Sequence, residues 1–282
     1  MKAFKKVRIL MAAALIMGAA MLGGCGGGAA GDGQASSGKV TASGSSALLP
    51  LLKPAQEEFH AQHKDVTVNI AGGGSFTGMN QVASGTVDIG NSDVELPAEY
   101  ADKGLVDHKV VVMPFVFITN PDVTVTNLTK QQYVGILTGK ITNWKQVGGQ
   151  DAPITLIHRA KSSGSRATIA RTVLNDAPFT DQAVIQDSNG AVRSAVASTP
   201  GAIGYVDAPY ADDTVKVLAF DGTAYSPEAV TAGRYPVWTY GHMYTKGEPQ
   251  GAVKAFLDYV MSDGFQNQYV EKTGLIPISK MK

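Results

Sequence analysis

The stretch VTVNIAGGGSFTGMNQV, residues 66–82, contains the pattern that decides the fold. Alternating β-branched residues predict a strand, three glycines and Ser75 predict a tight turn, and the residues after Ser75 are typical of a helix. The same order recurs in VTASGSSALL at 40–49 and in ITLIHRAKSSGSRATIA at 154–170. Each stretch therefore predicts a strand, a Gly/Ser turn and a helix, the repeating unit of α/β proteins.

The rest of the chain continues this alternation of short apolar runs and helical patterns. Strands are predicted at 39–42, 66–70, 87–89, 109–119, 154–157, 183–186 and 202–206. Helices are predicted at 51–63, 79–84, 129–137, 166–174, 191–197 and, as one long element, 252–270. Because alternating strands and helices form βαβ units, we predict an α/β fold with mostly parallel sheets flanked by helices.

The composition is that of a folded, globular chain with balanced charge. Of its 282 residues, 44% are hydrophobic and 17% are charged, which excludes the disordered and collagenous classes. Lysine and arginine together number 24, as do aspartate and glutamate, so no nucleic acid is expected as a partner. The single cysteine excludes a disulfide framework and a cysteine metal cluster.

The first 38 residues predict an exported, lipid-anchored protein. Residues 1–24 join four basic side chains to an apolar run at 9–22, which is too short to cross a bilayer comfortably and is typical of a signal peptide. The sequence LGGC ending at Cys25 resembles the lipobox of bacterial lipoproteins, in which the cysteine is lipidated. A plain signal peptide is the alternative. Cleavage leaves 20 basic and 24 acidic residues, a net charge of −4, and makes residues 25–38 a flexible tether.

The three Gly/Ser turns predict a binding site for a small oxyanion. In open α/β sheets, ligands bind at the carboxyl ends of the strands, and the free N–H groups of helix N-termini attract anions. Glycines let the backbone approach a ligand closely, and serine hydroxyls can donate to it. Neither GxxxxGK[ST] nor GxGxxG occurs at 72–78 or 162–166, so both nucleotide motifs are missing there. Ordinary helix capping is the alternative for each turn taken alone.

Two charged residues sharpen this prediction. Arg159 follows a predicted strand and could present its guanidinium fork to two oxygens of an anion. Asp93 also follows a strand, and an ionised carboxylate can only accept hydrogen bonds. It would therefore favour an oxyanion that carries a proton, such as monohydrogen phosphate, over sulfate. A helix cap before Leu96 and Pro97 is the alternative role for Asp93.

Several ordered blocks resemble the phosphate-binding lipoproteins and periplasmic proteins of the high-affinity phosphate ABC transporters. The resemblance runs from about Val40 to the C-terminus. Its blocks are GSSALLPL at 44–51, GGGSFTGMNQVASGTVDIGNSD at 72–93, NLTKQQYVGILTGKITNWKQVGG at 127–149, HRAKSSGSRATI at 158–169, NGAVRSAVASTPGAIGYV at 189–206 and YPVWTYGHMYTKG at 235–247.

The resemblance implies which residues hold phosphate. They are Ser46, the amide of Ala47, Ser75, Asp93, Arg159, Ser163, Gly164 and Ser165. Ser92 is expected to orient Asp93. The family's usual acidic residue, two positions after the arginine, is Lys161 here. We therefore expect Lys161 to point to solvent, and another acid or the ligand alone to orient Arg159.

The resemblance also implies a two-lobed fold of the type II periplasmic-binding-protein kind. One lobe would comprise 39–118 and 240–282 and the other 119–239, with two crossing strands as hinges. The lobes would close on inorganic phosphate and deliver it to the permease subunits of an ABC transporter. The protein is then expected to be no enzyme, to need no cofactor or metal, and to be anchored by lipid, palmitate included, to the outer face of the cell membrane.

Other functions stay open from the sequence. A receptor for sulfate or molybdate would share the fold, and a phosphate sensor or surface adhesin would share every motif. A secreted serine hydrolase is disfavoured because GxSxG is absent and the only SxxK, at 36–39, lies in the tether. His60 and His63 share a predicted helix with two glutamates, which is more typical of a solvated face than of a zinc site.

Overall fold

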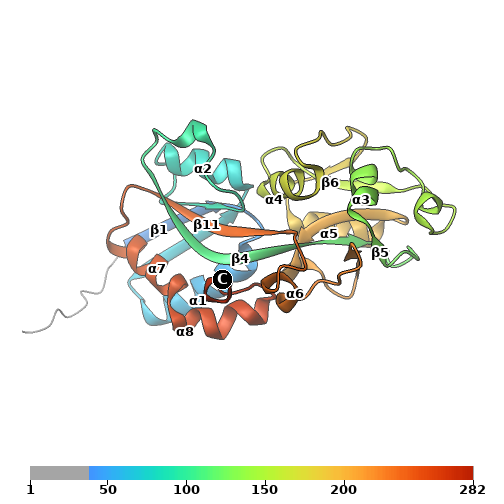
Figure 1. Ribbon diagram of the computed structural model, residues 1–282. Helices are drawn as coiled ribbons and strands as arrows, with labels where there is room; N and C mark the ends of the chain where they lie inside the picture. Colours follow the sequence, from blue (N-terminus) through green and yellow to red (C-terminus); the bar gives the residue numbers. More distant parts are fainter. Residues whose placement is uncertain (1–37, 282) are drawn as a thin grey trace, which may run out of the picture. The chain divides into compact units, whose positions relative to one another are not determined.

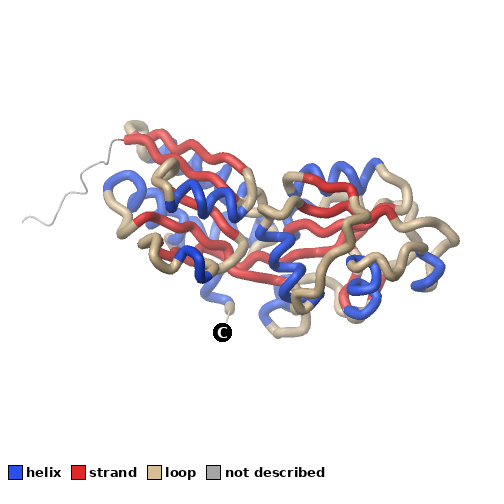
Figure 2. Tube along the Cα trace, turned by 90° about the horizontal axis from the view of Figure 1, so that it is seen from above, coloured by secondary structure: helices blue, strands red, loops and turns tan. Residues whose placement is uncertain are grey.

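The computed structural model describes residues 38–281 (Figures 1 and 2). The predicted signal peptide, the predicted lipidation site Cys25 and the predicted tether up to residue 37 lie outside the described residues. Among the described residues, no helix is both long and apolar enough to cross a membrane.

Within residues 38–281, nine strands form one sheet in the order β2-β1-β3-β11-β4-β8-β6-β7, with β9 pairing to β4. Their bounds are β1 Gly38–Gly44, β2 Val66–Gly72, β3 Ile89–Ser92, β4 Leu105–Thr119, β6 Thr155–Arg159, β7 Val184–Gln186, β8 Ala202–Asp207, β9 Lys216–Val217 and β11 Trp238–Lys246. A second, two-stranded sheet joins β5 Asn127–Leu128 to β10 Ala219–Phe220.

The sheet is mixed, and the α/β prediction is confirmed. β1 runs parallel to β2 and β3, and β6 runs parallel to β7 and β8. β4 and β11 introduce the antiparallel pairs, because β11 pairs with both β3 and β4, and β4 also pairs with β8. The apolar runs did not predict β11 as a strand, and only the family resemblance implied a crossing strand near residues 239 and 240. Its Gly241 allows the close approach of β4, since a Cβ there would lie 2.7 Å from the sulfur of Met113.

The long strand β4 connects two lobes (Figure 1). Its first part pairs with β11 in the first lobe, which also contains β1, β2 and β3, and its last part pairs with β8 in the second lobe, which also contains β6 and β7. From Val110 to Thr119 every residue of β4 is buried, which confirms the buried strand predicted there. Figure 2 shows helices flanking the strands of each lobe.

Helices cover both lobes. α1, α2 and α7 contact β2, β3 and β1 of the first lobe, whereas α4 and α5 contact β6 and β8 of the second. The α-helices are α1 Leu49–Gln62, α2 Ser75–Ala83, α3 Lys130–Leu137, α4 Gly164–Ile169, α5 Asn189–Ser198, α6 Pro227–Thr231, α7 Gly251–Met261 and α8 Asp263–Phe265. Short 3-10 helices are η1 Ala98–Tyr100, η2 Trp144–Val147, η4 Ala208–Tyr210, η6 Glu271–Thr273 and η7 Ile278–Lys280, and π-helical turns are η3 Ala170–Leu174 and η5 Gln266–Val270.

Apolar periodicity explains how α1 packs. Leu51, Ala55 and Phe59 recur every four residues and are all buried, so they form one face of the helix. β2 alternates buried Val66 and Val68 with exposed residues, as a half-buried strand does. The helix predicted at 51–63, after the first Gly/Ser turn, and the strand predicted at 66–70, before the second, are thus confirmed.

The prediction of one long helix at 252–270 is wrong. α7 ends at Met261, because Ser262 takes an extended conformation with ψ of 144°. The hydroxyl of Ser262 then accepts a hydrogen bond from the amide of Phe265 at 3.3 Å and caps the next helical turn. The capping preference of serine outweighed the continuous apolar pattern from which the long helix was predicted.

Candidate functional site

The three Gly/Ser turns lie at the carboxyl ends of β1, β2 and β6, as predicted. The first two belong to the first lobe and precede α1 and α2, whereas the third belongs to the second lobe and precedes α4. The turns meet across the lobes, because the amide of Phe76 donates to the carbonyl oxygen of Ser162 at 3.2 Å. Gly74, with φ of 91°, supplies the left-handed turn before α2.

Asp93 lies where these turns meet, directly after β3, and is only 1% exposed. Its Oδ2 accepts from the hydroxyl of Ser165 at 2.9 Å, and its Oδ1 accepts from the hydroxyl of Ser45. Its amide donates to the hydroxyl oxygen of Ser75 at 2.9 Å. Burial raises the pKa of Asp93, while the two serine hydroxyls and the charge of Arg159 oppose that rise. Asp93 is therefore a buried acceptor held by donors from both lobes.

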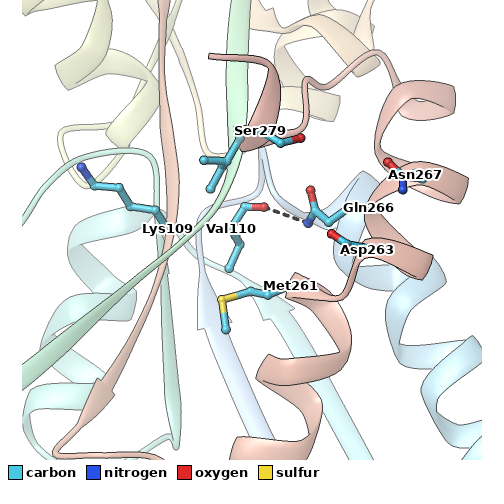
Figure 3. A pocket seen from close by; sticks show the side chains of 8 residues that line it. Lys109, Val110, Met261, Asp263, Gln266, Asn267 and Ser279 are labelled. Atoms are coloured by element: carbon cyan, nitrogen blue, oxygen red, sulfur yellow. Dashed lines mark hydrogen bonds between the residues drawn. The ribbon is translucent and has the colours of Figure 1, made fainter. Parts of the chain in front are cut away.

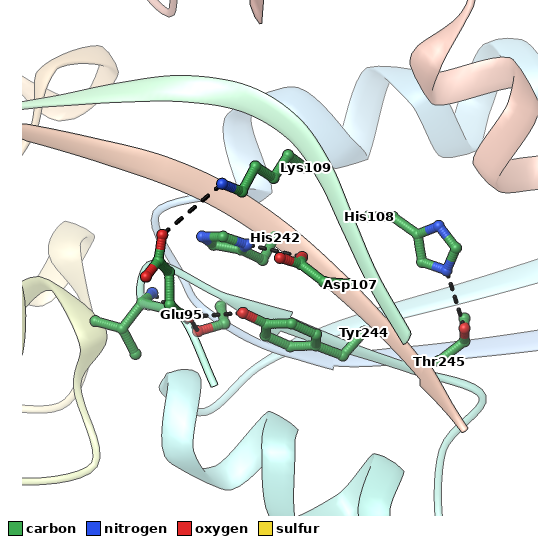
Figure 4. A network of polar contacts seen from close by, with 9 residues as sticks. Glu95, Asp107, His108, Lys109, His242, Tyr244 and Thr245 are labelled. Carbon is green, nitrogen blue, oxygen red and sulfur yellow. Dashed lines mark hydrogen bonds and ion pairs between the residues drawn. The ribbon is translucent and has the colours of Figure 1, made fainter. Parts of the chain in front are cut away.

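Strand β11 supports the segment that carries Asp93. Figure 4 shows Tyr244 of β11 donating from its hydroxyl to the carbonyl oxygen of Val94, at 3.0 Å. The neighbouring His242 is fully buried, and its Nδ1 lies 2.8 Å from Oδ1 of Asp107. Ser92, expected to orient Asp93, donates to the carbonyl oxygen of Val94 at 2.7 Å and so bends the chain around Asp93.

Arg159 ends β6 and is also 1% exposed. Its Nη1 donates to the hydroxyl of Ser165 at 3.3 Å and its Nη2 donates to the carbonyl oxygen of Asp187 at 3.0 Å. Within the described part of the chain, its Nε has no hydrogen-bond partner. Burial lowers the pKa of Arg159, and the charge of Asp93 counteracts this. Lys161 is exposed, so a main-chain carbonyl and a serine hydroxyl orient the guanidinium here.

Ser46 and Ala47 form the buried turn between β1 and α1. The hydroxyl oxygen of Ser46 accepts two hydrogen bonds from Asn189 of the second lobe, one from its main-chain amide and one from its side chain, each at 3.2 Å. The amide of Ala47 donates to the hydroxyl oxygen of Ser45 at 3.0 Å. Ser45 thus links the first turn to Asp93, a contact that the sequence analysis did not anticipate.

Ser163, Gly164 and Ser165 form the turn that begins α4. The hydroxyl of Ser163 accepts from the amide of Arg166 at 3.2 Å and caps the helix, as in the capping alternative. Gly164 touches the first lobe, because a Cβ at this position would overlap the hydroxyl of Ser75 and lie 2.8 Å from the Cβ of Ser75. A glycine is therefore required at this contact between the lobes.

Asp207 is a buried acid that the sequence analysis missed. It ends β8, and among residues 38–281 neither of its carboxyl oxygens has a hydrogen-bond partner. Burial, reinforced by the negative charge of Asp93, raises the pKa of Asp207 well above its ordinary value. Its position after the buried run AIGYV at 202–206 was the available signal, since the carboxyl ends of strands carry ligand-binding residues in such sheets.

His158, next to Arg159, adds no charge to the site. Its Nδ1 lies 2.7 Å from the hydroxyl of Tyr205. Burial, together with the charges of Arg166 and Arg159, lowers the pKa of His158 to about 3, so its ring is neutral near pH 7. The charge of Arg159, which is joined to Asp93 through the hydroxyl of Ser165, lowers the pKa of Asp93.

The molecular surface has several hollows. One of about 140 Å³ lies beside β4 and the C-terminal segments (Figure 3), and its lining residues are Lys109, Val110, Met261, Asp263, Gln266, Asn267, Ile278 and Ser279. None of these residues belongs to the Gly/Ser turns. The candidate site is instead enclosed, because its side chains are almost completely buried between the lobes.

Known proteins share the sequence family and the fold of this chain. Residues 29–264 match the family described as the PBP superfamily domain. The phosphate-binding protein PstS of Bacillus subtilis is 44% identical over 246 residues, which cover 86% of this chain and 82% of that protein.

Two solved structures share the fold. A substrate-binding protein from Clostridium perfringens, solved with bound phosphate, is 32% identical with a TM-score of 0.81, and the match covers 86% of this chain and 100% of that one. An ABC-type phosphate transport receptor from Vibrio cholerae is 25% identical with a TM-score of 0.70, covering 84% of this chain and 99% of that one.

Proposed function

This chain belongs to the PBP superfamily and, within it, to the phosphate-binding PstS family, and from this we propose that it captures inorganic phosphate outside the cytoplasm for an ABC transporter. The fold is that of a two-lobed binding protein, and the relatives are binding proteins. In this role the chain performs no catalysis. Its partners are phosphate and the permease subunits that receive it.

The single observation that carries the proposal is the position of Asp93. A buried carboxyl lies among serine hydroxyls and a guanidinium contributed by both lobes. The donors attract an oxyanion, whereas Asp93 can accept a hydrogen bond from a ligand oxygen that carries a proton. Monohydrogen phosphate meets both requirements, and sulfate at neutral pH lacks the proton.

We propose that eight residues bind the phosphate. The unpartnered Nε of Arg159 and the glycine at 164, which leaves room for backbone approach, support this assignment. In the contacts described above, the hydroxyl of Ser165 already joins Arg159 to Asp93. The eight residues are Ser46, Ala47, Ser75, Asp93, Arg159, Ser163, Gly164 and Ser165.

We further propose that residues 39–118 with 240–282 and residues 119–239 move as two bodies that close on the ligand. β4 and the segment entering β11 would be the hinges, since Phe115 donates from its amide to the carbonyl oxygen of Val237 where both segments cross. Closure excludes water and so strengthens each charge-assisted hydrogen bond. A lipid on Cys25 would hold the protein at the outer face of the cell membrane, which the LGGC sequence supports.

Calorimetric titration tests the function. The chain without residues 1–24, carrying Cys25→Ser, would be stripped of ligand by partial unfolding and titrated with phosphate, sulfate and molybdate at pH 5 to 8. We expect one-to-one binding of phosphate and no heat from sulfate. Asp93→Asn should lose this selectivity, whereas Asp181→Asn, at an exposed acid, should keep it. Absence of both phosphate heat and a thermal shift would overturn the proposal.

A further inference from the structure

Ser46 and Asn189 make a direct contact between the lobes. Ser46 lies in the turn after β1 of the first lobe, and Asn189 is the first residue of α5 in the second lobe. They are 3% and 0% exposed, so no solvent competes for their hydrogen bonds. The main-chain amide and Nδ2 of Asn189 both donate to the hydroxyl oxygen of Ser46, each at 3.2 Å.

The side chain of Asn189 is oriented by a third hydrogen bond. Its Oδ1 accepts from the amide of Asp207 at 3.1 Å. Because a backbone amide can only donate, the oxygen of the Asn189 side chain must face Asp207 and its NH₂ group must face Ser46. The reverse orientation would place the NH₂ group of Asn189 against the amide of Asp207, so that two donors would face each other.

These bonds determine whether the Ser46 hydroxyl donates or accepts its remaining hydrogen bond. A serine hydroxyl has one hydrogen to donate and two lone pairs to accept with. Asn189 occupies both lone pairs, so the hydroxyl hydrogen is left to be donated to another group. The hydroxyl of Tyr210 also donates to the carbonyl oxygen of Ser46 at 2.5 Å, which holds the main chain of Ser46 from the second lobe.

We infer that Asn189 is a positioning residue that, when the lobes close, makes the Ser46 hydroxyl an obligate donor toward the bound oxyanion. This inference rests on the proposed function and adds a specificity-determining residue to it. A dedicated donor at Ser46 requires a ligand oxygen without a proton, whereas Asp93 accepts from the oxygen that carries one. The two residues together then set the orientation of monohydrogen phosphate between the lobes.

A double-mutant cycle tests this inference by calorimetric titration with phosphate. Asn189→Ala is measured in three backgrounds: the wild type, Ser46→Thr, which keeps the hydroxyl, and Ser46→Ala, which removes it. Because Asn189 acts through the hydroxyl, Asn189→Ala should weaken phosphate binding about tenfold in the first two backgrounds and less than about twofold in the third. A purely structural role would give the same loss in all three, and that result would overturn the inference.

Tyr210→Phe is the matched control, since it removes a cross-lobe hydrogen bond to the carbonyl oxygen of Ser46 rather than to its hydroxyl. Its effect should be the same in the wild-type and Ser46→Ala backgrounds, and an effect that vanishes in Ser46→Ala would contradict the inference. If Asn189→Ala fails to fold, the uncharged Asn189→Leu, which is of similar size and also removes the side-chain donor, takes its place in the cycle. If the wild type itself did not bind phosphate, that result would instead refute the proposed function.

Discussion

Adding one methyl group at Gly164 should make closure of the lobes less favourable. In Gly164→Ala the new Cβ would overlap the hydroxyl of Ser75 and lie 2.8 Å from the Cβ of Ser75 and 3.0 Å from that of Asp93. Real Cβ contacts are longer than this, so Ser75 must shift. Because Gly164 belongs to the second lobe and Ser75 to the first, the overlap is relieved simply by keeping the lobes apart.

The magnitude follows from two losses. Overpacking a close contact costs about 1–3 kcal/mol, and a shift of Ser75 also weakens the 2.9 Å hydrogen bond from the amide of Asp93, worth about 1 kcal/mol. Closure then becomes about 2–4 kcal/mol less favourable. At 1.4 kcal/mol for each factor of ten, phosphate affinity should fall by about 30-fold to about 700-fold.

Calorimetric titration with phosphate measures this loss, and thermal melting without phosphate measures folding. The melting temperature should not fall, because alanine favours helix α4 more than glycine does. Gly190→Ala is the control, since a Cβ there would lie 3.7 Å from the ring of Tyr210, an ordinary contact, and phosphate affinity should be unchanged. Phosphate affinity in Gly164→Ala within about twofold of the wild type would refute the steric reasoning.

Three further predictions concern Asp207, Lys161 and Ser262. Burial raises the pKa of Asp207 above 3.8, so the stability that the protonated carboxyl contributes is complete below that pH and is lost as the pH rises through the folded-state pKa. As the pH rises above about 4, the unfolding free energy of Asp207→Asn should therefore increase relative to that of the wild type. A pH-independent difference in ligand-free urea unfolding would refute this. Lys161→Asp should change phosphate affinity by no more than about twofold in titration, because Lys161 is exposed and Arg159 is already held by Asp187 and Ser165. A larger change would show that Lys161 acts on the site. Ser262→Ala should lower the unfolding free energy by about 0.5–2 kcal/mol in urea and leave phosphate affinity unchanged, and equal stability would show that the cap contributes nothing.

The site was predictable to the extent that its residues lie in local motifs. Ser75 and Gly164 were found because Gly/Ser turns between a strand and a helix are visible in a short window of sequence. Asp93 and Arg159 were found because a charged residue at the end of an apolar run stands out. Their burial between the lobes, and the meeting of the turns, were not visible in any window.

The residues that sequence reasoning missed act through partners that are distant in the chain. Asn189 contacts Ser46, which is 143 positions away, and Tyr210 contacts it from 164 positions away. Nothing near these residues distinguishes them from an ordinary helix start and an ordinary surface tyrosine. The strand β11 was missed for a similar reason, because its pairing with β3 and β4 brings together segments from opposite ends of the chain.

The sequence by itself determined the α/β class, the three Gly/Ser turns and the candidate ligands, because periodicity, turn chemistry and charge are local properties of the chain. Only the tertiary structure decided which atoms each of these binding residues faces. The carboxyl of Asp93 is a buried acceptor because Ser45 and Ser165 donate to it from different lobes, and the hydroxyl of Ser46 is left as a donor because Asn189 occupies its lone pairs. The polarity of a hydrogen-bonding group depends on its neighbours in space, and these come together only when the chain has folded.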